Sequence, residues 1–225
     1  MKAGVFITGT DTGVGKTVVS CALARGLRTA AIDVGVMKPA ETGVLEAGPL
    51  DALALIEAAG VKDELELVCP IQFVMPAAPQ ASALAEDRVV SIDHIQQSFT
   101  ELQSRHEFML VEGAGGLLVP LDEKTTMADL AEKLELPVLI VARASLGTIN
   151  HTLLTLEACA TRCLDVVGVV LSHSTGFLSE ADAQNLDLLR QSLKEHLIGE
   201  IHPQSRPDET APEDAGLDAV LSLAR

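Results

Sequence analysis

The feature that most constrains the fold is a glycine-rich stretch near the start of the chain, Gly-Thr-Asp-Thr-Gly-Val-Gly-Lys-Thr at residues 9–17. It follows an apolar run at residues 5–7 and precedes a helix-forming run that begins at Val18. A strand, a glycine-rich turn and a helix in this order surround an anion with backbone N–H groups and the positive end of a helix dipole. Lys16 can neutralise phosphate oxygens, and the hydroxyl of Thr17 can bind Mg²⁺. The stretch therefore predicts a nucleoside triphosphate site.

This loop is one residue longer than the common phosphate-binding pattern. That pattern has four residues between its first glycine and the Gly-Lys-Thr, whereas five residues separate Gly9 from Gly15. Gly13, Gly15 and the Lys-Thr pair nevertheless stand between a strand and a helix. We therefore interpret the stretch as a phosphate loop, and a glycine turn with a chance Lys-Thr pair is the alternative.

Apolar runs and helical periodicity alternate along the rest of the chain. Strands are predicted at residues 5–7, 34–37, 108–112, 138–141, 166–171 and 198–201. Helices are predicted from the phosphate loop to about residue 28, from residue 51, over 92–105 and 126–136, from within 145–154, over about 179–196, and in the acidic tail. Residues 68–82 carry three prolines and are expected to be extended or loop, and residues 202–207 are expected to be loop.

This alternation, together with the composition, predicts a single α/β domain over residues 1–225. The chain is 48% hydrophobic but has no Trp, no Tyr and only 5 Phe, so its core must be packed from Ala, Val, Leu and Ile. Such a core suits parallel strands covered by helices. Right-handed crossovers then give a mostly parallel sheet of about seven strands with helices on both faces, similar to that of phosphate-loop NTPases.

Net charge and apolar patterning exclude several partners. A formal charge of -16 argues against nucleic acid and against anionic membrane surfaces, both of which require a basic footprint. The apolar part of the first residues is too short for a signal peptide, and no apolar stretch approaches the roughly 18–20 residues of a membrane span. We expect a cytoplasmic protein.

The 4 cysteines lack a Cys-x-x-Cys pair and are expected to be buried apolar residues, and the 6 histidines lack metal-ligand spacing.

Three charged residues stand where strands end or helices begin. Lys38 follows the strand at 34–37, so it is expected on the same rim of the sheet as Lys16 unless it is a solvated loop lysine. Asp51 begins a helix and is either a capping or first-turn acid or a metal ligand. Glu112 ends an apolar strand, where phosphate-loop enzymes place a Mg²⁺ carboxylate, and the glycines of 113–116 allow close approach of a ligand. A simple turn is the alternative there.

The segment at residues 145–154 turns into a long helix whose first N–H groups can receive an anion. Helix capping alone and binding of a carboxylate both explain it. The residues by themselves thus predict a Mg²⁺-dependent nucleotide enzyme or switch, and they name no substrate.

Four motifs occur in order along nearly the whole chain. They are the phosphate loop at 9–17, Lys-Pro-Ala-Glu-Thr-Gly at 38–43, Val-Glu-Gly-Ala-Gly-Gly at 111–116, and Ser-Leu-Gly-Thr-Ile-Asn-His-Thr-Leu-Leu at 145–154. Together they resemble the ATP-dependent dethiobiotin synthetases. The resemblance implies a C–N bond-forming cyclo-ligase of biotin biosynthesis. In that reaction 7,8-diaminononanoate takes up CO₂ or bicarbonate as a carbamate, ATP converts the carbamate to a carbamic-phosphoric mixed anhydride, and the second amine closes the ureido ring with release of ADP and phosphate.

The resemblance also implies roles for individual residues. Lys16 and Lys38 would hold the γ-phosphate and the carbamate oxygens with help from the hydroxyl of Thr12, where charge develops during transfer. The Mg²⁺ ligands would be oxygen donors, namely Thr17, Asp51 and Glu112. The nucleotide-binding residues would be Gly13, Val14, Gly15, Lys16, Thr17, Val18, Asp51, Glu112, Gly113, Ala114, Gly115, Ser172, His173, His202, Pro203 and Gln204. The substrate-binding residues would be Thr42, Gly147, Thr148, Ile149 and Asn150, of which the last four receive the substrate carboxylate across the interface of a homodimer.

Three positions depart from the pattern of the family. Gly13 stands where many relatives carry an acidic residue, Gln80 replaces a common His, and Ser172 replaces an Asn whose amide reads adenine. Loss of a buried amide contact weakens discrimination by about 1–3 kcal/mol. We therefore expect ATP to be accepted together with other nucleoside triphosphates.

Two other classes of protein are alternatives. A related ATP-dependent amidation synthetase would need an attached glutaminase domain with a nucleophilic Cys, for which 225 residues leave no room. A partitioning-type ATPase would bind DNA or membrane, which the acidic chain disfavours.

Overall fold

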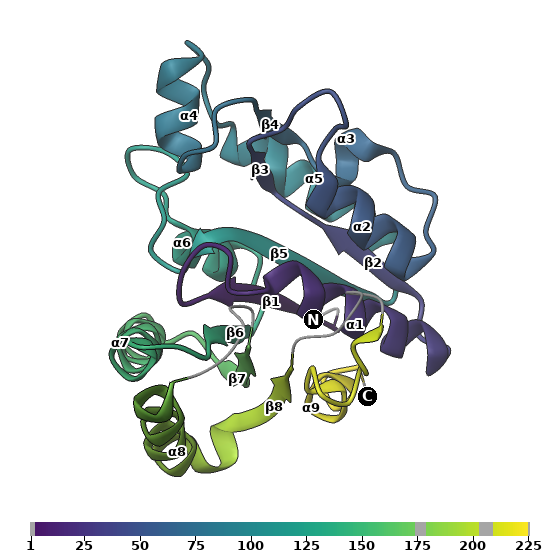
Figure 1. Ribbon diagram of the computed structural model, residues 1–225. Helices are drawn as coiled ribbons and strands as arrows, with labels where there is room; N and C mark the ends of the chain where they lie inside the picture. The colour runs from purple at the N-terminus through teal and green to yellow at the C-terminus, as the bar shows by residue number, and fades with distance from the viewer. Residues whose placement is uncertain (1–2, 174–178, 203–208, 225) are drawn as a thin grey trace.

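A parallel β-sheet forms the centre of the computed structural model, which describes residues 3–173, 179–202 and 209–224 (Figure 1). Its strands follow the order β2-β5-β1-β6-β7-β8, and every neighbouring pair is parallel. The strands are β1 (Ala3–Gly9), β2 (Val34–Met37), β5 (Phe108–Gly116), β6 (Val138–Arg143), β7 (Val166–Ser172) and β8 (Leu197–Ile201). The predicted fold class is confirmed, although the main sheet of the described residues has six strands instead of about seven.

Helices cover both faces of this sheet (Figure 1). α1 packs against α2 and α9, α5 packs against β2 and β5, and α7 packs against α8. The helices are α1 (Lys16–Thr29), α2 (Leu50–Ala59), α3 (Leu65–Val68), α4 (Pro79–Ala85), α5 (Ile92–Arg105), α6 (Met127–Lys133), α7 (Thr148–Thr161), α8 (Glu180–Leu193) and α9 (Leu217–Leu221), with a 3-10 turn η1 at Lys194–His196.

The segment between β2 and α5 differs from the prediction. Residues 40–42, which lie beyond the predicted end of the strand at 34–37, form strand β3 (Ala40–Thr42), which pairs in parallel with β4 (Ile71–Phe73) in a separate two-stranded sheet. Residues 68–82, expected to be extended or loop, also contain most of helix α4. Pro79 occupies the start of this helix, where its missing N–H group has no intrahelical partner to lose. The proline therefore begins a helix instead of excluding one.

The central strands are buried from both sides, which explains their continuous apolar character. Val5, Phe6 and Ile7 of β1 are fully buried, as are Leu110 and Val111 of the neighbouring β5. Because all the strands run in the same direction, the loops that follow them meet at one edge of the sheet. The phosphate loop follows β1 at this edge.

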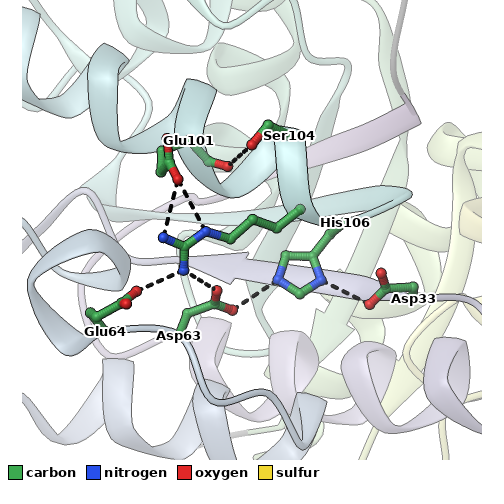
Figure 2. A network of polar contacts seen from close by, with 7 residues as sticks. Asp33, Asp63, Glu64, Glu101, Ser104 and His106 are labelled. Carbon is green, nitrogen blue, oxygen red and sulfur yellow. Dashed lines mark hydrogen bonds and ion pairs between the residues drawn. The ribbon is translucent and has the colours of Figure 1, made fainter.

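A polar network lies where β2 and β5 begin, at the opposite edge of the sheet (Figure 2). His106 places one ring nitrogen 2.8 Å from Asp33 and the other 2.8 Å from Asp63. Gly35 makes room for this ring, because a Cβ atom there would lie 2.5 Å from Cδ2 of His106. The network links the loop before β2, the loop after α2 and the end of α5.

Cys21, Cys69 and Cys159 are buried, as predicted for the cysteines, but Cys163 is exposed. Cys163 follows α7 in a turn and has a φ of 54°. Across the described ranges, none of the helices combines the length and the apolar character that crossing a bilayer would require.

Candidate active site

A cleft of about 440 Å³ lies at the carboxyl edge of the sheet, where the loops after β1 and β2 meet the last residues of β5 and the start of α2. It gathers most of the residues that the sequence assigned to a nucleotide and metal site, although they are distant in the sequence. The residues that line it are Thr12, Gly13, Gly15, Lys16, Thr17, Val18, Lys38, Ala40, Glu41, Thr42, Asp51, Glu112, Ala114 and Gly115.

The phosphate loop forms one wall of this cleft. Gly13 and Gly15 have φ values of 68° and 96°, in the left-handed region that glycine adopts without strain. Gly15 is the N-cap of α1 and, as a glycine, has no side chain with which to cap the helix. The first N–H groups of α1 are therefore available to an anion.

Lys16 points its ammonium group back toward the loop, 3.4 Å from the carbonyl oxygen of Asp11. The residue is 7% exposed. Burial and the nearby charge of Lys38 lower the pKa of Lys16 to about 8. The nearby carboxylates of Glu112, Asp51 and Asp11 only partly offset these two effects, so an anion in the cleft would further stabilise the charged form of Lys16.

Lys38 lies between two carboxylates at the inner end of the cleft. Its Nζ atom is 2.7 Å from Oδ2 of Asp51 and 2.5 Å from Oε1 of Glu112. Thr17 donates a hydrogen bond of 3.0 Å to the same oxygen of Glu112. Burial alone would lower the pKa of Lys38, but Glu112 and Asp51 outweigh it and raise that pKa above its usual value. Lys38 is therefore a fixed positive charge inside the cleft.

The oxygen atoms around Lys38 fit a hard divalent cation. Glu112 is fully buried, and its Oε2 atom has no hydrogen-bond partner among the described residues. Such an unpaired carboxylate oxygen is costly unless a ligand completes the site. Burial raises the pKa of Asp51, but the ammonium of Lys38 outweighs burial and holds that pKa below its usual value, so this second carboxylate remains ionised. Thr17, Asp51 and Glu112 thus present the oxygen donors that Mg²⁺ prefers.

Two residues of the site were missed by the sequence reasoning. Glu41, in β3, accepts hydrogen bonds from the backbone N–H groups of Asp51 and Ala52, each at 3.0 Å. Arg143, at the end of β6, donates to the carbonyl oxygen of Thr12 at 2.6 Å. Glu41 stands inside the motif at residues 38–43, which was a usable signal. Nothing in the sequence marks Arg143 except its place at a strand end.

Two predicted nucleotide-binding residues lie behind the cleft instead of lining it. Val14 is fully buried. Gly113 packs against Phe6, since a Cβ atom at Gly113 would lie 2.9 Å from the ring. Glu112 and Gly113 belong to the interior of β5, which continues four residues beyond the predicted end of the strand at 112.

The predicted substrate residues are divided between two places. Thr42 lines the cleft. Gly147, Ile149 and Asn150 line a different hollow of about 530 Å³ between α7 and α8, and Thr148 is buried at the start of α7. Leu146, next to this hollow in the sequence, is 77% exposed. One chain alone therefore does not bring the start of α7 into the phosphate cleft.

The remaining predicted nucleotide-binding residues lie at the ends of two strands: Ser172 ends β7, His173 follows it, and His202 follows β8. Ser172 is buried beneath the phosphate loop, since a Cβ atom at Gly15 would lie 2.6 Å from its Oγ. His173 contacts Glu200 at 2.6 Å, and its ring centroid is 4.4 Å from that of His202. Pro203 and Gln204 lie outside the described residues.

The histidines are therefore less scattered than their spacing in the sequence suggested. His173, Glu200 and His202 bring potential metal-ligand atoms within 4.8 Å of one another. Arg190, however, already donates to both carboxylate oxygens of Glu200, at 2.5 and 3.1 Å. Both oxygens of Glu200 are thus already paired, whereas Oε2 of Glu112 has no partner among the described residues, so the cluster at Glu200 offers no free carboxylate oxygen to a metal ion.

Comparison with known proteins adds a family to this geometry. A family model described as an AAA domain matches residues 3–210. A protein of Anaeromyxobacter dehalogenans (strain 2CP-C) named ATP-dependent dethiobiotin synthetase BioD is 53% identical over 171 residues, which cover 76% of this chain and 77% of the relative. A protein of the same name from Thermodesulfovibrio yellowstonii is 38% identical, covering 99% of this chain and 100% of the relative.

Solved structures resemble the chain in fold. The MinC:MinD cell division complex of Aquifex aeolicus matches with a TM-score of 0.57 and 15% sequence identity, covering 99% of this chain and 94% of the other. The pNOB8 ParA protein bound to nonspecific DNA matches with a TM-score of 0.57 and 14% identity, covering 99% and 98%. At such low identity these likenesses establish the phosphate-loop NTPase fold alone.

Proposed function

The chain belongs to the ATP-dependent dethiobiotin synthetase family, and we propose that it closes the ureido ring of dethiobiotin from 7,8-diaminononanoate, CO₂ and ATP. Membership of the family makes it an ATP-dependent ligase of biotin biosynthesis. The observation that carries the finer proposal is the position of Lys38. Its buried ammonium faces the cleft beside the phosphate loop and is held by two carboxylates.

The proposed reaction has three steps. One amine of the substrate attacks CO₂ and loses a proton, which gives a carbamate. A carbamate oxygen then attacks the γ-phosphorus of ATP, and the bond to the ADP oxygen breaks. Finally the second amine attacks the carbamoyl carbon, and phosphate leaves as the ureido ring closes and this amine loses its proton.

Each step concentrates negative charge where the cleft offers positive charge. Lys16 and the first N–H groups of α1 are suited to the β- and γ-phosphates. Lys38 is suited to the carbamate and to the oxygens of the transferred phosphoryl group, and the hydroxyls of Thr12 and Thr42 can donate hydrogen bonds to them. Charges fixed in advance by burial and hydrogen bonds stabilise a transition state without reorganisation.

Mg²⁺ bound to the nucleotide would neutralise its phosphates during the transfer. We propose that Thr17, Asp51 and Glu112 hold this ion directly or through water. The unpaired Oε2 of Glu112 supports the proposal. Asp51 and Glu112 also hold the ammonium of Lys38, so the same two carboxylates would position both the cation and this lysine.

The distal carboxylate of the substrate requires a second binding site. We propose that the start of α7, with Gly147, Thr148, Ile149 and Asn150, receives it from the partner subunit of a cytoplasmic homodimer of single-domain chains. Support comes from the hollow at this helix start and from exposed apolar side chains on the same element, Leu153 and Leu154, at 44% and 55% exposure. Exposed apolar groups of this kind favour contact with another subunit.

The reaction is tested by the dependence of ATP hydrolysis on its other substrates. We expect ADP and dethiobiotin to form in equal amounts when 7,8-diaminononanoate and bicarbonate are both present, and not when either is omitted. Ammonia and a carboxylate in their place would stimulate an amidation synthetase, and DNA would stimulate a partitioning ATPase. A rate of ATP hydrolysis that does not change when the diamine is added would refute the proposed function.

A further inference from the structure

Glu41 is a buried carboxylate in the cleft that none of the proposed steps uses. It is 7% exposed and lies in β3, between Lys38 and Thr42. Its Oε1 accepts the N–H of Asp51 and its Oε2 accepts the N–H of Ala52, both at 3.0 Å. Both carboxylate oxygens are thus committed to two consecutive backbone groups of another element.

These two backbone groups belong to the first turn of α2. The N-cap of this helix is Pro49, whose side chain accepts no hydrogen bond. The first N–H groups of a helix have no intrahelical partner, and a side-chain oxygen at the N-cap ordinarily accepts from one of them. Glu41 replaces that cap from a strand ten residues upstream of Asp51.

The backbone of Glu41 is itself fixed. Glu41 pairs with Gln72 in the two-stranded sheet of β3 and β4. Lys38, three residues earlier, donates its backbone N–H to the carbonyl oxygen of Val68 at 2.8 Å. The carboxylate therefore holds the start of α2 against a rigid support.

The helix start held by Glu41 carries Asp51, whose side chain reaches Lys38 at 2.7 Å. We propose that Glu41 is a positioning residue that fixes the first turn of α2, so that the carboxylate of Asp51 meets both Lys38 and the cation of the nucleotide. This inference rests on the proposed metal role of Asp51. It assigns Glu41 no contact with substrate.

The geometry explains why a carboxylate is required at position 41. Both donors are backbone N–H groups, so both side-chain oxygens must be acceptors. In Glu41→Gln the amide NH₂ would face one of these N–H groups, and one donor of the helix start would lose its partner. Glu41→Asp keeps two acceptors on a side chain that is one methylene shorter.

The test measures metal binding without the diamine, so it is independent of the proposed reaction. Mn²⁺ is titrated by electron paramagnetic resonance into the enzyme saturated with ADP. For Glu41→Gln we expect the Kd of Mn²⁺ to rise by roughly tenfold or more, as is typical when a partner of a metal ligand is removed. The Kd of ADP without metal should stay within about twofold, and Glu41→Asp should lie between Glu41→Gln and the wild type.

Two further measurements separate positioning from general stability. Hydrogen exchange of the amides at residues 50–53 should accelerate in Glu41→Gln. Ser91→Ala removes the N-cap of α5, which accepts from His94, and this control should leave Mn²⁺ affinity unchanged. Unchanged Mn²⁺ affinity in Glu41→Gln would overturn the inference whether or not exchange accelerates, and an equal loss in Ser91→Ala would also overturn it. Failure of the diamine to stimulate hydrolysis would refute the proposed reaction and leave this result standing.

Discussion

The ammonium nitrogen of Lys38 lies 2.5 Å from Oε1 of Glu112, and neither side chain is more than 4% exposed. A charged pair of this kind is costly to bury, because both ions lose their hydration. Here the pair faces a cleft that also contains the phosphate loop.

Lys38→Ala should lower kcat by about 10²-fold or more, on the order of 2.7 kcal/mol of transition-state stabilisation. The lysine supplies charge to the carbamate and the transferred phosphoryl group, whereas the phosphate loop binds the nucleotide, so ADP binding should persist. The control Lys62→Ala removes an exposed lysine and should leave kcat unchanged. A wild-type kcat for Lys38→Ala, with a normal Kd for ADP, would remove Lys38 from the reaction.

Glu112→Gln should raise the Mg²⁺ concentration needed for half-maximal turnover. The amide is a weaker ligand than a carboxylate, and the effect should be roughly tenfold or more, as for loss of a partner of a metal ligand. The measurement is a Mg²⁺ titration of ADP formation, with Glu66→Gln on the exposed side of α3 as the control. An unchanged titration would leave Glu112 with a structural role only.

Nucleotide affinity should fall as the pH rises above about 8, the pKa to which burial and Lys38 lower Lys16 in the free protein. Phosphate binding favours the charged lysine and raises its pKa, so the affinity is fully present below pH 8 and falls by at most about tenfold per pH unit above it. The Kd of ADP is measured from pH 7 to 10. Lys16→Arg keeps its charge over this range, and a profile as steep as that of the wild type would exclude Lys16 as the cause.

The base preference should be broad, because Ser172 has no amide and is buried beneath Gly15. A lost amide contact corresponds to about 1–3 kcal/mol of discrimination. Comparable kcat/KM values for ATP, CTP and GTP are expected. Strict dependence on ATP would show that other groups read the base.

The network around His106 should make stability depend on pH (Figure 2). Burial alone would lower the pKa of His106, but its bonds to Asp33 and Asp63 outweigh burial and raise that pKa above its usual 6.5. Because the folded state binds the proton more tightly, this stability is fully present below pH 6.5 and is lost as the pH rises through the raised pKa. The free energy of unfolding, measured by urea titration between pH 5.5 and 9, should therefore fall.

The control for this prediction follows from the neighbours of the ring. Asp63 also pairs with Arg105, at 3.1 Å, and Arg105 in turn contacts Glu64 and Glu101. These pairs remain when His106 is replaced, so His106→Gln should flatten the pH dependence without unfolding the protein. His94→Gln changes an exposed histidine and should retain the slope. A slope that survives in His106→Gln would assign it to another group.

The local parts of the site could be predicted from the sequence because their residues are contiguous. Strand, loop and helix around residues 9–17 follow directly from apolar patterning and glycine, and α5 begins after Ser91 as its periodicity predicts. The resemblance to a family then assigned Lys38, Asp51 and Glu112 to one place. The structure brings these three residues together, although 74 positions separate Lys38 from Glu112.

Other features depended on contacts that no local pattern encodes. Glu41 and Arg143 act through backbone groups of distant segments, and a backbone N–H or carbonyl leaves no mark in the sequence. Pro79 illustrates a second difficulty. A proline interrupts the interior of a helix but fits its first turn, so the residue by itself does not distinguish a loop from the start of a helix.

The sequence by itself determined the phosphate loop, the parallel α/β architecture and the family, because each can be recognised from contiguous motifs and from the order of those motifs along the chain. Only the tertiary structure decided that Lys38 is held between two carboxylates, that one of them has a buried oxygen with no partner among the described residues, and that the start of α7 lies outside the phosphate cleft. The physical reason is that burial and pairing of charges depend on which strand ends and helix starts meet in space. Which of these segments come into contact depends on how the whole sheet and its helices pack.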